Sequence, residues 1–162
     1  MTNIHRTLMT LMLRNADWCG LVLILLIFSA FQTKKTTQGI TGVVLWKAGN
    51  FMPAPDAPKR TDKTTPVVRE VYIYELTTET QTEKDEAGFY QKINTRFIKK
   101  VKTGLSGRFW VRLPVGNYSL FVKEEKGLYA NSFDDANNIF PVQVQRKKWS
   151  KVSFTVDYQA VY

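Results

Sequence analysis

The chain has 162 residues, of which 44% are hydrophobic and 13% aromatic. This length fits one ordinary domain with a leader or tail, and the apolar content suffices for a core, which argues against wholesale disorder. The formal net charge is +9, and a basic excess favours contact with anions such as phospholipid, lipopolysaccharide or acidic glycans. We favour the alternative of a soluble surface with scattered lysines. Because the chain lacks the dense Lys/Arg block that nucleic-acid binders carry, we predict no nucleic-acid partner.

Residues 1–32 are typical of a signal peptide or short N-terminal anchor. Arg6 and Arg14 precede an apolar run at residues 21–28, and small residues follow it. The run is too short to cross about 30 Å of hydrocarbon as a helix. The cleavage site is atypical, so an uncleaved anchor stays open as the alternative. Either way we expect an exported protein that is periplasmic, outer-membrane-associated or extracellular, and that contacts a membrane only through an uncleaved leader.

Cysteine and histidine occur once each, as Cys19 and His5, and both lie in the predicted leader. If the leader is removed, the remaining chain has no disulfide, no Cys-based zinc site and no histidine general base. Nucleophile pairs of the Ser-His-Asp or Cys-His type are excluded on the same ground. We therefore expect no catalytic residue, no metal site and no cofactor.

A polar tether at residues 33–38 leads into a domain predicted at residues 39–162. From residue 40 onward the hydrophobic pattern has a period of 2, which indicates strands rather than helices. Two insertions, at residues 49–66 and 77–88, are expected to be loops; the first of them is rich in proline, which central strands exclude. The expected strands are residues 40–47, 67–76, 89–102, 108–113, 118–123, 140–144 and 152–158.

About seven short strands with turns between them predict an all-β, single antiparallel two-sheet sandwich. Alternation of apolar and polar residues gives each sheet one face toward water, which favours antiparallel pairing. In the stretch from residue 108 to 113 we expect Phe109 and Val111 to point inward. In the next we expect Tyr118, Leu120 and Val122 to do so.

Two neighbouring motifs specify a local shape. Gly107 allows a backbone conformation that a Cβ would strain, and Pro114 and Gly116 stop one strand and turn the chain. Tyr118 then begins the next strand, and we expect its ring to pack on the hairpin that the two strands form. The full signature, in the pattern G-x-F then L-P-x-G-x-Y, consists of Gly107, Phe109, Leu113, Pro114, Gly116 and Tyr118.

This signature resembles that of carboxypeptidase regulatory-like domains, which have a transthyretin-like (prealbumin-like) sandwich. Gly42-Val43-Val44 is similar to the family's opening strand, and residues 152–156 are similar to its closing one. The resemblance implies a non-catalytic accessory role, because such domains flank peptidases, precede outer-membrane receptors or stand alone. No catalytic or barrel domain follows here, so we expect the stand-alone form. The histidines of the related transthyretin-like hydrolases are absent, so we do not carry their activity over.

Three residues on one strand form the first candidate site. Arg108, Trp110 and Arg112 alternate with the inward residues, so they share the opposite face. An Arg-Trp-Arg stripe could stack a sugar or hold an anionic partner. The alternative, which we favour, is a tryptophan covered by a loop with its arginines in water.

The polar loop at residues 129–138 is the second candidate. Tyr129, Asn131, Asp134 and Asp135 could contact a ligand, and its oxygen atoms could hold Ca²⁺. The spacing does not match a D-x-[DN]-x-[DN]-G calcium loop, and Asn/Asp clusters are also typical of plain turns. We favour the plain turn.

Three further charged groups have simple interpretations. Arg146, Lys147 and Lys148 could touch anionic lipid, but a solvated turn is favoured. A second group, formed by Lys99, Lys100 and Lys102, is expected to guard an edge strand against aggregation. The acids Glu83, Asp85 and Glu86 do not predict the two fixed carboxylates that glycoside hydrolysis needs.

The sequence therefore favours a non-catalytic, exported interaction or scaffold module of the cell envelope, whose partner is an unidentified envelope protein or glycan. The alternative is a carbohydrate- or calcium-binding module that uses Trp110 or the polar loop. A third hypothesis is an enzyme that uses only carboxylates, lysine or serine.

Overall fold

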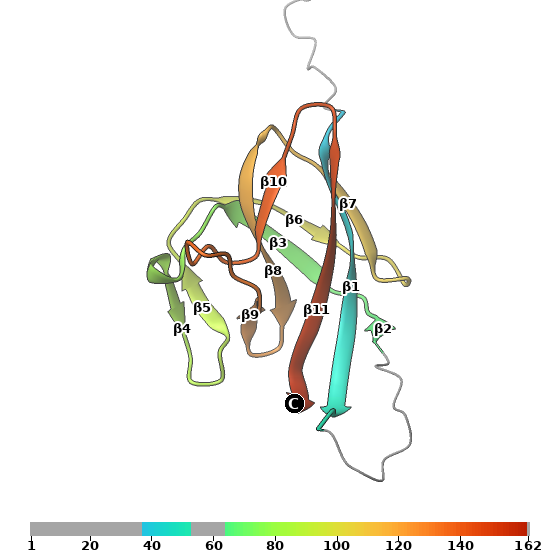
Figure 1. Ribbon diagram of the computed structural model, residues 1–162, viewed down its shortest axis with the longest axis vertical. Helices are drawn as coiled ribbons and strands as arrows, with labels where there is room; N and C mark the ends of the chain where they lie inside the picture. Colours follow the sequence, from blue (N-terminus) through green and yellow to red (C-terminus); the bar gives the residue numbers. More distant parts are fainter. Residues whose placement is uncertain (1–36, 53–63, 162) are drawn as a thin grey trace, which may run out of the picture. The chain divides into compact units, whose positions relative to one another are not determined.

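A computed structural model describes residues 37–52 and 64–161. The predicted leader and most of the tether lie outside the described residues, as does much of the proline-rich insertion. The regular secondary structure of the described part is almost wholly β-strand, arranged in two layers (Figure 1). Its one helical element is a single turn of 3₁₀-helix, η1 (Glu79–Gln81). Residues 37–52 and 64–161 contain no apolar helix of membrane-spanning length.

The first layer is a four-stranded sheet in which β1 is central. Strand β11 lies on one side of β1, and β7 and β2 pair with different parts of its other side. Its strands are β1 (Gly39–Asn50), β2 (Thr65–Pro66), β7 (Arg108–Arg112) and β11 (Trp149–Val161).

The second layer is a seven-stranded sheet in the order β4-β5-β9-β8-β3-β6, with β10 paired to β8. The long strand β8 is central and pairs with β3, β9 and β10. The strands are β3 (Glu70–Glu75), β4 (Thr82–Lys84), β5 (Tyr90–Ile93), β6 (Phe97–Lys102), β8 (Gly116–Glu124), β9 (Gly127–Tyr129) and β10 (Pro141–Val144).

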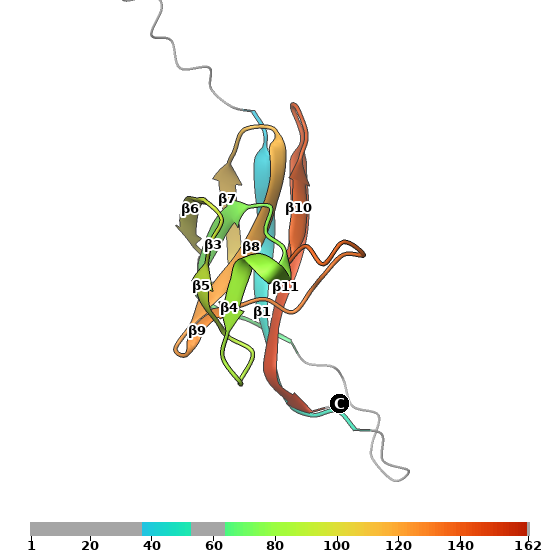
Figure 2. The ribbon, with the colours of Figure 1, turned by 90° about the vertical axis from the view of Figure 1, so that its left-hand side faces the viewer.

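The predicted all-β, two-sheet antiparallel sandwich is therefore confirmed, with more strands than expected. One pair departs from it, because β1 and β11 run parallel over most of their length. Parallel neighbours need a long connection, and here the first and last described strands are joined by almost the whole domain. Figure 2 shows the same strands from the side.

Two segment predictions were too coarse. The stretch from residue 89 to 102, expected as one bent strand, is the two strands β5 and β6. The expected loop at 77–88 contains η1 and β4, which pairs with β5 through a bulge. The local sequence pattern predicted neither the division into β5 and β6 nor the strand β4, because strands this short depend on the partner that they pair with.

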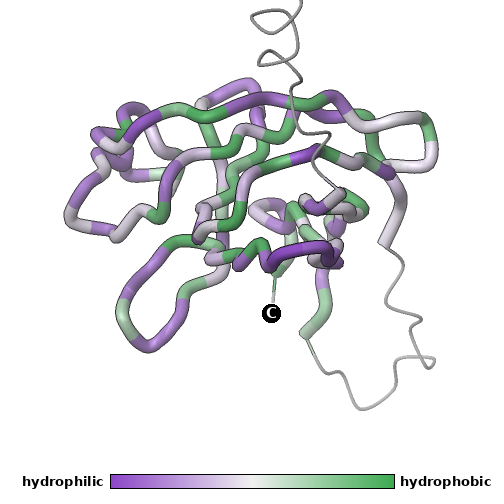
Figure 3. Tube along the Cα trace, turned by 90° about the horizontal axis from the view of Figure 1, so that it is seen from above, coloured by the Kyte–Doolittle hydropathy of each residue, from purple (hydrophilic) through white to green (hydrophobic). Residues whose placement is uncertain are grey.

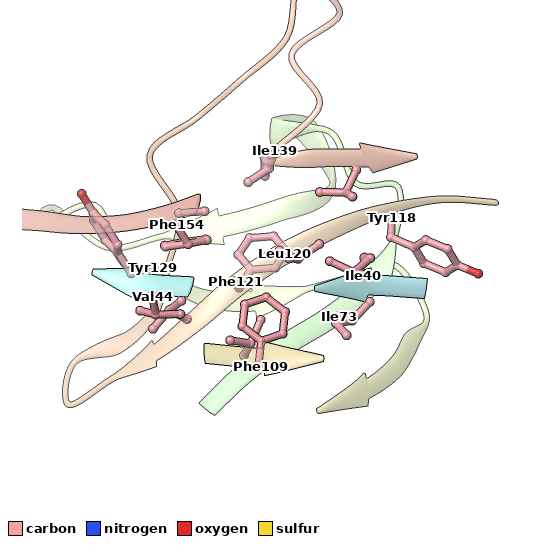
Figure 4. Close-up of a cluster of buried hydrophobic side chains, with 14 of the residues drawn as sticks. Ile40, Val44, Ile73, Phe109, Tyr118, Leu120, Phe121, Tyr129, Ile139 and Phe154 are labelled. Carbon is pink, nitrogen blue, oxygen red and sulfur yellow. The ribbon is translucent and has the colours of Figure 1, made fainter. Parts of the chain in front are cut away.

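The core lies between the sheets. Figure 3 shows hydrophobic and hydrophilic residues alternating along the strands, as half-buried sheets require. From the four-stranded sheet, Ile40, Val44 and Phe154 are fully buried, and they meet Ile73 and Leu120 of the other sheet (Figure 4). Burying side chains of this size contributes about 1.5–3 kcal/mol each.

Strand β8 is buried on both faces, which alternation alone did not predict. Tyr118, Leu120 and Val122 are buried as expected, but Ser119 and Phe121 are buried too. The rings of Tyr90 and Tyr74 cover Phe121, with centroids 5.0 and 5.6 Å from its own. A second layer of aromatic contact thus lies on the other face of the seven-stranded sheet.

Candidate binding cleft

Strand β7 presents the predicted arginine–tryptophan stripe at the surface. Phe109 and Val111 are buried, whereas Arg108, Trp110 and Arg112 are exposed. Trp110 is 64% exposed as a residue, so it lies at the surface and no loop of the described chain covers it. The Arg112 guanidinium stands 5.7 Å from the centroid of the indole ring, a cation–π distance.

A cleft of about 600 Å³ separates β7 from β6. The two strands lie near each other in both views of the ribbon (Figures 1 and 2), although they belong to different sheets. The predicted guard lysines of β6 line this cleft together with the stripe of β7. Its charged and aromatic lining consists of Lys99, Lys100, Lys102, Arg108, Trp110 and Arg112.

The floor of the cleft is apolar, because Val101, Phe109 and Val111 also line it. No acidic side chain belongs to the lining. Lys100 has a compensating carboxylate, because Oε1 of Glu70 lies 3.1 Å from its ammonium. The hydrogen bond from Lys100 holds the pKa of Glu70 below its ordinary value, and Glu70 raises the pKa of Lys100.

Four of the cations in the cleft form no ion pair in the described part of the chain, although one of them, Lys102, lies opposite Glu70 in the ladder of β3 and β6. Within the described residues, none of the ion pairs involves Lys99, Lys102, Arg108 or Arg112. Opposite charges normally intersperse on a soluble surface. Here one sign collects on both walls of a cleft, which focuses the potential and attracts an anion.

The residues of the second candidate site are held by two separate sets of hydrogen bonds. Tyr129 is buried and donates a hydrogen bond from its hydroxyl to Asp157 Oδ1 at 2.8 Å. The Asn131 side-chain amide donates to the same oxygen at 2.6 Å. These two predicted residues therefore converge on Asp157 of β11, whereas the hydrogen bonds of Asp134 stay within the turn that follows.

Asp134 closes its own turn. Its Oδ1 accepts the backbone N–H groups of Ala136 and Asn138, at 3.0 and 2.9 Å, and its Oδ2 accepts the Asn138 side-chain amide at 2.8 Å. The Asn138 side chain, with these N–H groups, holds the pKa of Asp134 below its ordinary value. In the described parts of the chain, no three His, Cys, Asp or Glu side chains come together as a metal site would require.

The acidic residues at positions 83 and 85 also form ion pairs or hydrogen bonds with neighbouring residues. Glu83 lies on β4 and pairs with Lys92 of β5 at 2.8 Å. Asp85 accepts the backbone N–H of Phe89 at 2.8 Å and the Gln91 side chain at 2.9 Å. The first of these hydrogen bonds is the main cause of the lowered pKa of Asp85.

The signature residues build the passage from β7 to β8. A Cβ on Gly107, whose φ is +68°, would lie 2.5 Å from the Val44 carbonyl oxygen. Phe109 and Leu113 are buried. The Tyr118 hydroxyl donates to the Pro114 carbonyl at 3.0 Å, and its ring packs over Gly116.

This passage is a corner between two sheets and not the hairpin that the motif suggested. Strand β7 belongs to the four-stranded sheet and β8 to the seven-stranded one. The tyrosine therefore fixes the angle at which the chain crosses the sandwich. The motif specifies packing at that corner and brings no reactive group to the surface.

No protein-family profile, no curated protein and no solved structure matches this chain. The likeness to carboxypeptidase regulatory-like domains stays a prediction, based on the signature residues and the sandwich.

Sequence reasoning identified both walls of the cleft but did not join them. Only five residues, 103–107, separate β6 from β7, and this short spacing was the signal available. This spacing does not by itself predict a cleft, because strands that follow each other in sequence usually pair as a hairpin in one sheet. Here the connection passes from one sheet to the other, so the side chains meet across a cleft.

Proposed function

We propose that this chain is a non-catalytic interaction module that holds an anionic partner in the cleft between β6 and β7. The observation that carries the proposal is the set of five lysine and arginine side chains on both walls of one cleft, with no acidic side chain in its lining and an exposed tryptophan beside them. Indole and guanidinium groups are enriched where proteins bind partners. The predicted leader favours a place in the cell envelope, and the signature favours an accessory domain of the carboxypeptidase regulatory-like kind.

The proposal is tested by binding of two polyanions, poly-L-glutamate and heparin, to the full-length chain. We expect at least one of them to bind, with an affinity that falls steeply between low and physiological salt. Arg112→Gln should weaken that binding about threefold, because an exposed ion pair contributes up to about 1 kcal/mol. Lys126→Gln removes the same charge in the turn between β8 and β9 and should leave binding unchanged.

Two results would refute the proposal. One is the absence of binding to both polyanions at low salt. The other is an equal loss of polyanion affinity in the Arg112→Gln and Lys126→Gln proteins, because binding would then depend on the net charge of the protein and not on the cleft.

A second candidate is carbohydrate binding at Trp110, favoured by the 64% exposure of that residue. Because Arg112 stands over the ring, an acidic sugar fits this surface better than a neutral one. Trp110→Ala should abolish binding to an array of uronate-containing glycans, and retention of glycan binding by that variant would exclude Trp110 as the platform. The calcium alternative has less support, because both Asp134 oxygens already accept hydrogen bonds within their loop.

A further inference from the structure

Both strands that border the cleft are edge strands of their sheets. In the described residues β7 pairs only with β1, and β6 pairs only with β3. An edge strand presents backbone N–H and C=O groups that can pair with another extended chain. The cleft therefore offers hydrogen-bonding backbone as well as charge.

The hydrogen bonds at the two ends of β7 show which of its backbone groups face the cleft. The N–H of Val44 donates to the Gly107 carbonyl at 2.9 Å, and the N–H of Leu113 donates to Gln38 at 3.4 Å. Residues of an antiparallel strand alternate between facing the partner and facing away. Since 107 and 113 face β1, the residues at 109 and 111 do so too, and those at 108, 110 and 112 face outward.

Two of the outward residues are available for pairing. The carbonyl of Arg108 already accepts the N–H of Gly104 at 2.8 Å. The backbone groups of Trp110 and Arg112 have no such bond within the described segments. Their side chains lie on the exposed face of the sheet, so one strand laid here would meet backbone donors and acceptors together with cationic side chains.

Charge decides what kind of strand fits. A second copy of β7 or β6 in this position would set arginine or lysine opposite arginine, and like charges directly opposite destabilise a pair. Lys99 reinforces this, because it points to the inner side of its sheet like Val101 and yet is exposed. Inward-pointing charge on an edge strand discourages pairing with neutral strands. An acidic strand meets no such obstacle.

We propose that an extended acidic segment of a partner protein adds to the four-stranded sheet as a further strand along β7. This deepens the proposed function and rests on it. Acidic side chains of the segment lie on the face of Arg108 and Arg112, and the residues between them face inward toward Val101. At about 3.3 Å per residue, a strand of about five residues matches the length of β7.

The test uses three peptides with the same sequence, an eight-residue alternation of Glu and Val. One is unmodified, one is N-methylated at every Glu and one at every Val, so charge and length stay constant. Alternate N–H groups of a strand face its partner, so only one methylated set removes the hydrogen bonds to β7. We expect that set to weaken binding to the full-length chain at least tenfold and the other less than threefold.

Amide hydrogen exchange of the same complexes locates the added strand. In the free protein the N–H groups of Phe109 and Val111, which face β1, should exchange slowly, and those of Trp110 and Arg112 quickly. The unmodified peptide should slow the exchange of Trp110 and Arg112. Protection at Lys100 and Lys102 instead would overturn the assignment to β7.

The remaining outcomes separate the inference from the function beneath it. If both methylated peptides bind as tightly as the parent, or both fail equally, strand addition is wrong and only electrostatic attraction is left. If heparin binds and no peptide does, the cleft holds an acidic glycan, and the inference fails while the proposed function stands. If neither heparin nor any peptide binds, both fail.

Discussion

The guanidinium of Arg69 donates from Nε to Oε1 of Glu124 at 2.6 Å. Arg69 precedes β3 and Glu124 ends β8, while the other carboxylate oxygen accepts the hydroxyl of Tyr158 in β11 at 3.2 Å. The Glu124 side chain is only 2% exposed. Since β8 and β11 belong to different sheets, this buried carboxylate joins the two layers through charged and polar contacts.

Replacing Glu124 with alanine should lower the free energy of unfolding by about 2 kcal/mol. Loss of one partner from a buried pair costs about 3–5 kcal/mol, and we discount this because the Arg69 side chain is 33% exposed and water can solvate it. Urea denaturation measures the change. Glu124→Gln keeps the shape and one acceptor oxygen, so it should lose less; an equal loss in both variants would show that packing and not pairing matters here.

Gly107→Ala should destabilise the protein by roughly 2–4 kcal/mol. The φ of +68° is strained for any residue with a Cβ, and the added carbon would lie 2.5 Å from the Val44 carbonyl oxygen. Gly104, three residues earlier, is the matched control, because a Cβ there would meet only the Arg108 carbonyl oxygen at 3.8 Å. Thermal unfolding measures both changes, and Gly104→Ala should leave the melting temperature nearly unchanged. Similar melting temperatures for the Gly107→Ala and Gly104→Ala proteins would contradict the prediction.

Tyr118→Phe should cost about 1 kcal/mol, because it removes the hydrogen bond that the hydroxyl donates to the Pro114 carbonyl across the corner. Tyr72→Phe serves as a control of the same chemistry. The Tyr72 hydroxyl donates to Glu70 at 3.3 Å near the surface, where water can replace it. If the two substitutions lower the denaturant midpoint equally, the Pro114 contact has no special weight.

Tyr90→Phe is expected to stabilise the protein by up to about 1 kcal/mol. The Tyr90 hydroxyl is buried and has no hydrogen-bond partner of ordinary geometry in the described residues, and the Lys84 ammonium is the nearby charge that acts on it. Removing it therefore relieves a polar group that lost its water on folding. Lys84 lies 4.9 Å from the centroid of the ring, and a destabilised variant would show that this contact depends on the hydroxyl.

The same residue predicts a response to alkali. Burial raises the pKa of Tyr90 above its ordinary value, although Lys84 acts in the opposite direction. A raised folded-state pKa means that the unfolded chain ionises first, so this contribution to stability is complete below about pH 10 and is lost as the pH rises through the folded-state value. Denaturant midpoints measured from pH 8 to 11 should fall less in Tyr90→Phe than in the parent protein.

Much of the sandwich was predictable because a strand's pattern is local. In β7 every second residue is buried, as the alternation of Phe109 and Val111 with charged residues required. The roles of Gly107 and Tyr118 were also predictable, because both depend on local structure. Gly107 adopts a backbone conformation that a Cβ would strain, and the Tyr118 hydroxyl reaches the carbonyl of Pro114, four residues earlier.

The features of the fold that the sequence did not predict depend on contacts between residues distant in sequence. Phe121 reads as an outward residue, yet it is buried because rings from β3 and β5 meet over it. β4 exists only because β5 pairs with it. The parallel neighbours β1 and β11 are more than a hundred residues apart in register, as in Gly39 opposite Trp149, and no local pattern carries that information.

The sequence by itself determined that this chain forms alternating strands, that Trp110 and its flanking arginines face outward, and that the predicted exported part lacks cysteine and histidine. The tertiary structure alone decided that the lysines of β6 lie across a cleft from that stripe, and that Glu124 is buried against Arg69. The physical reason is that periodicity fixes which way a side chain points within its strand. Which sheet a strand joins, and what it then faces, depends on the packing of the whole sandwich.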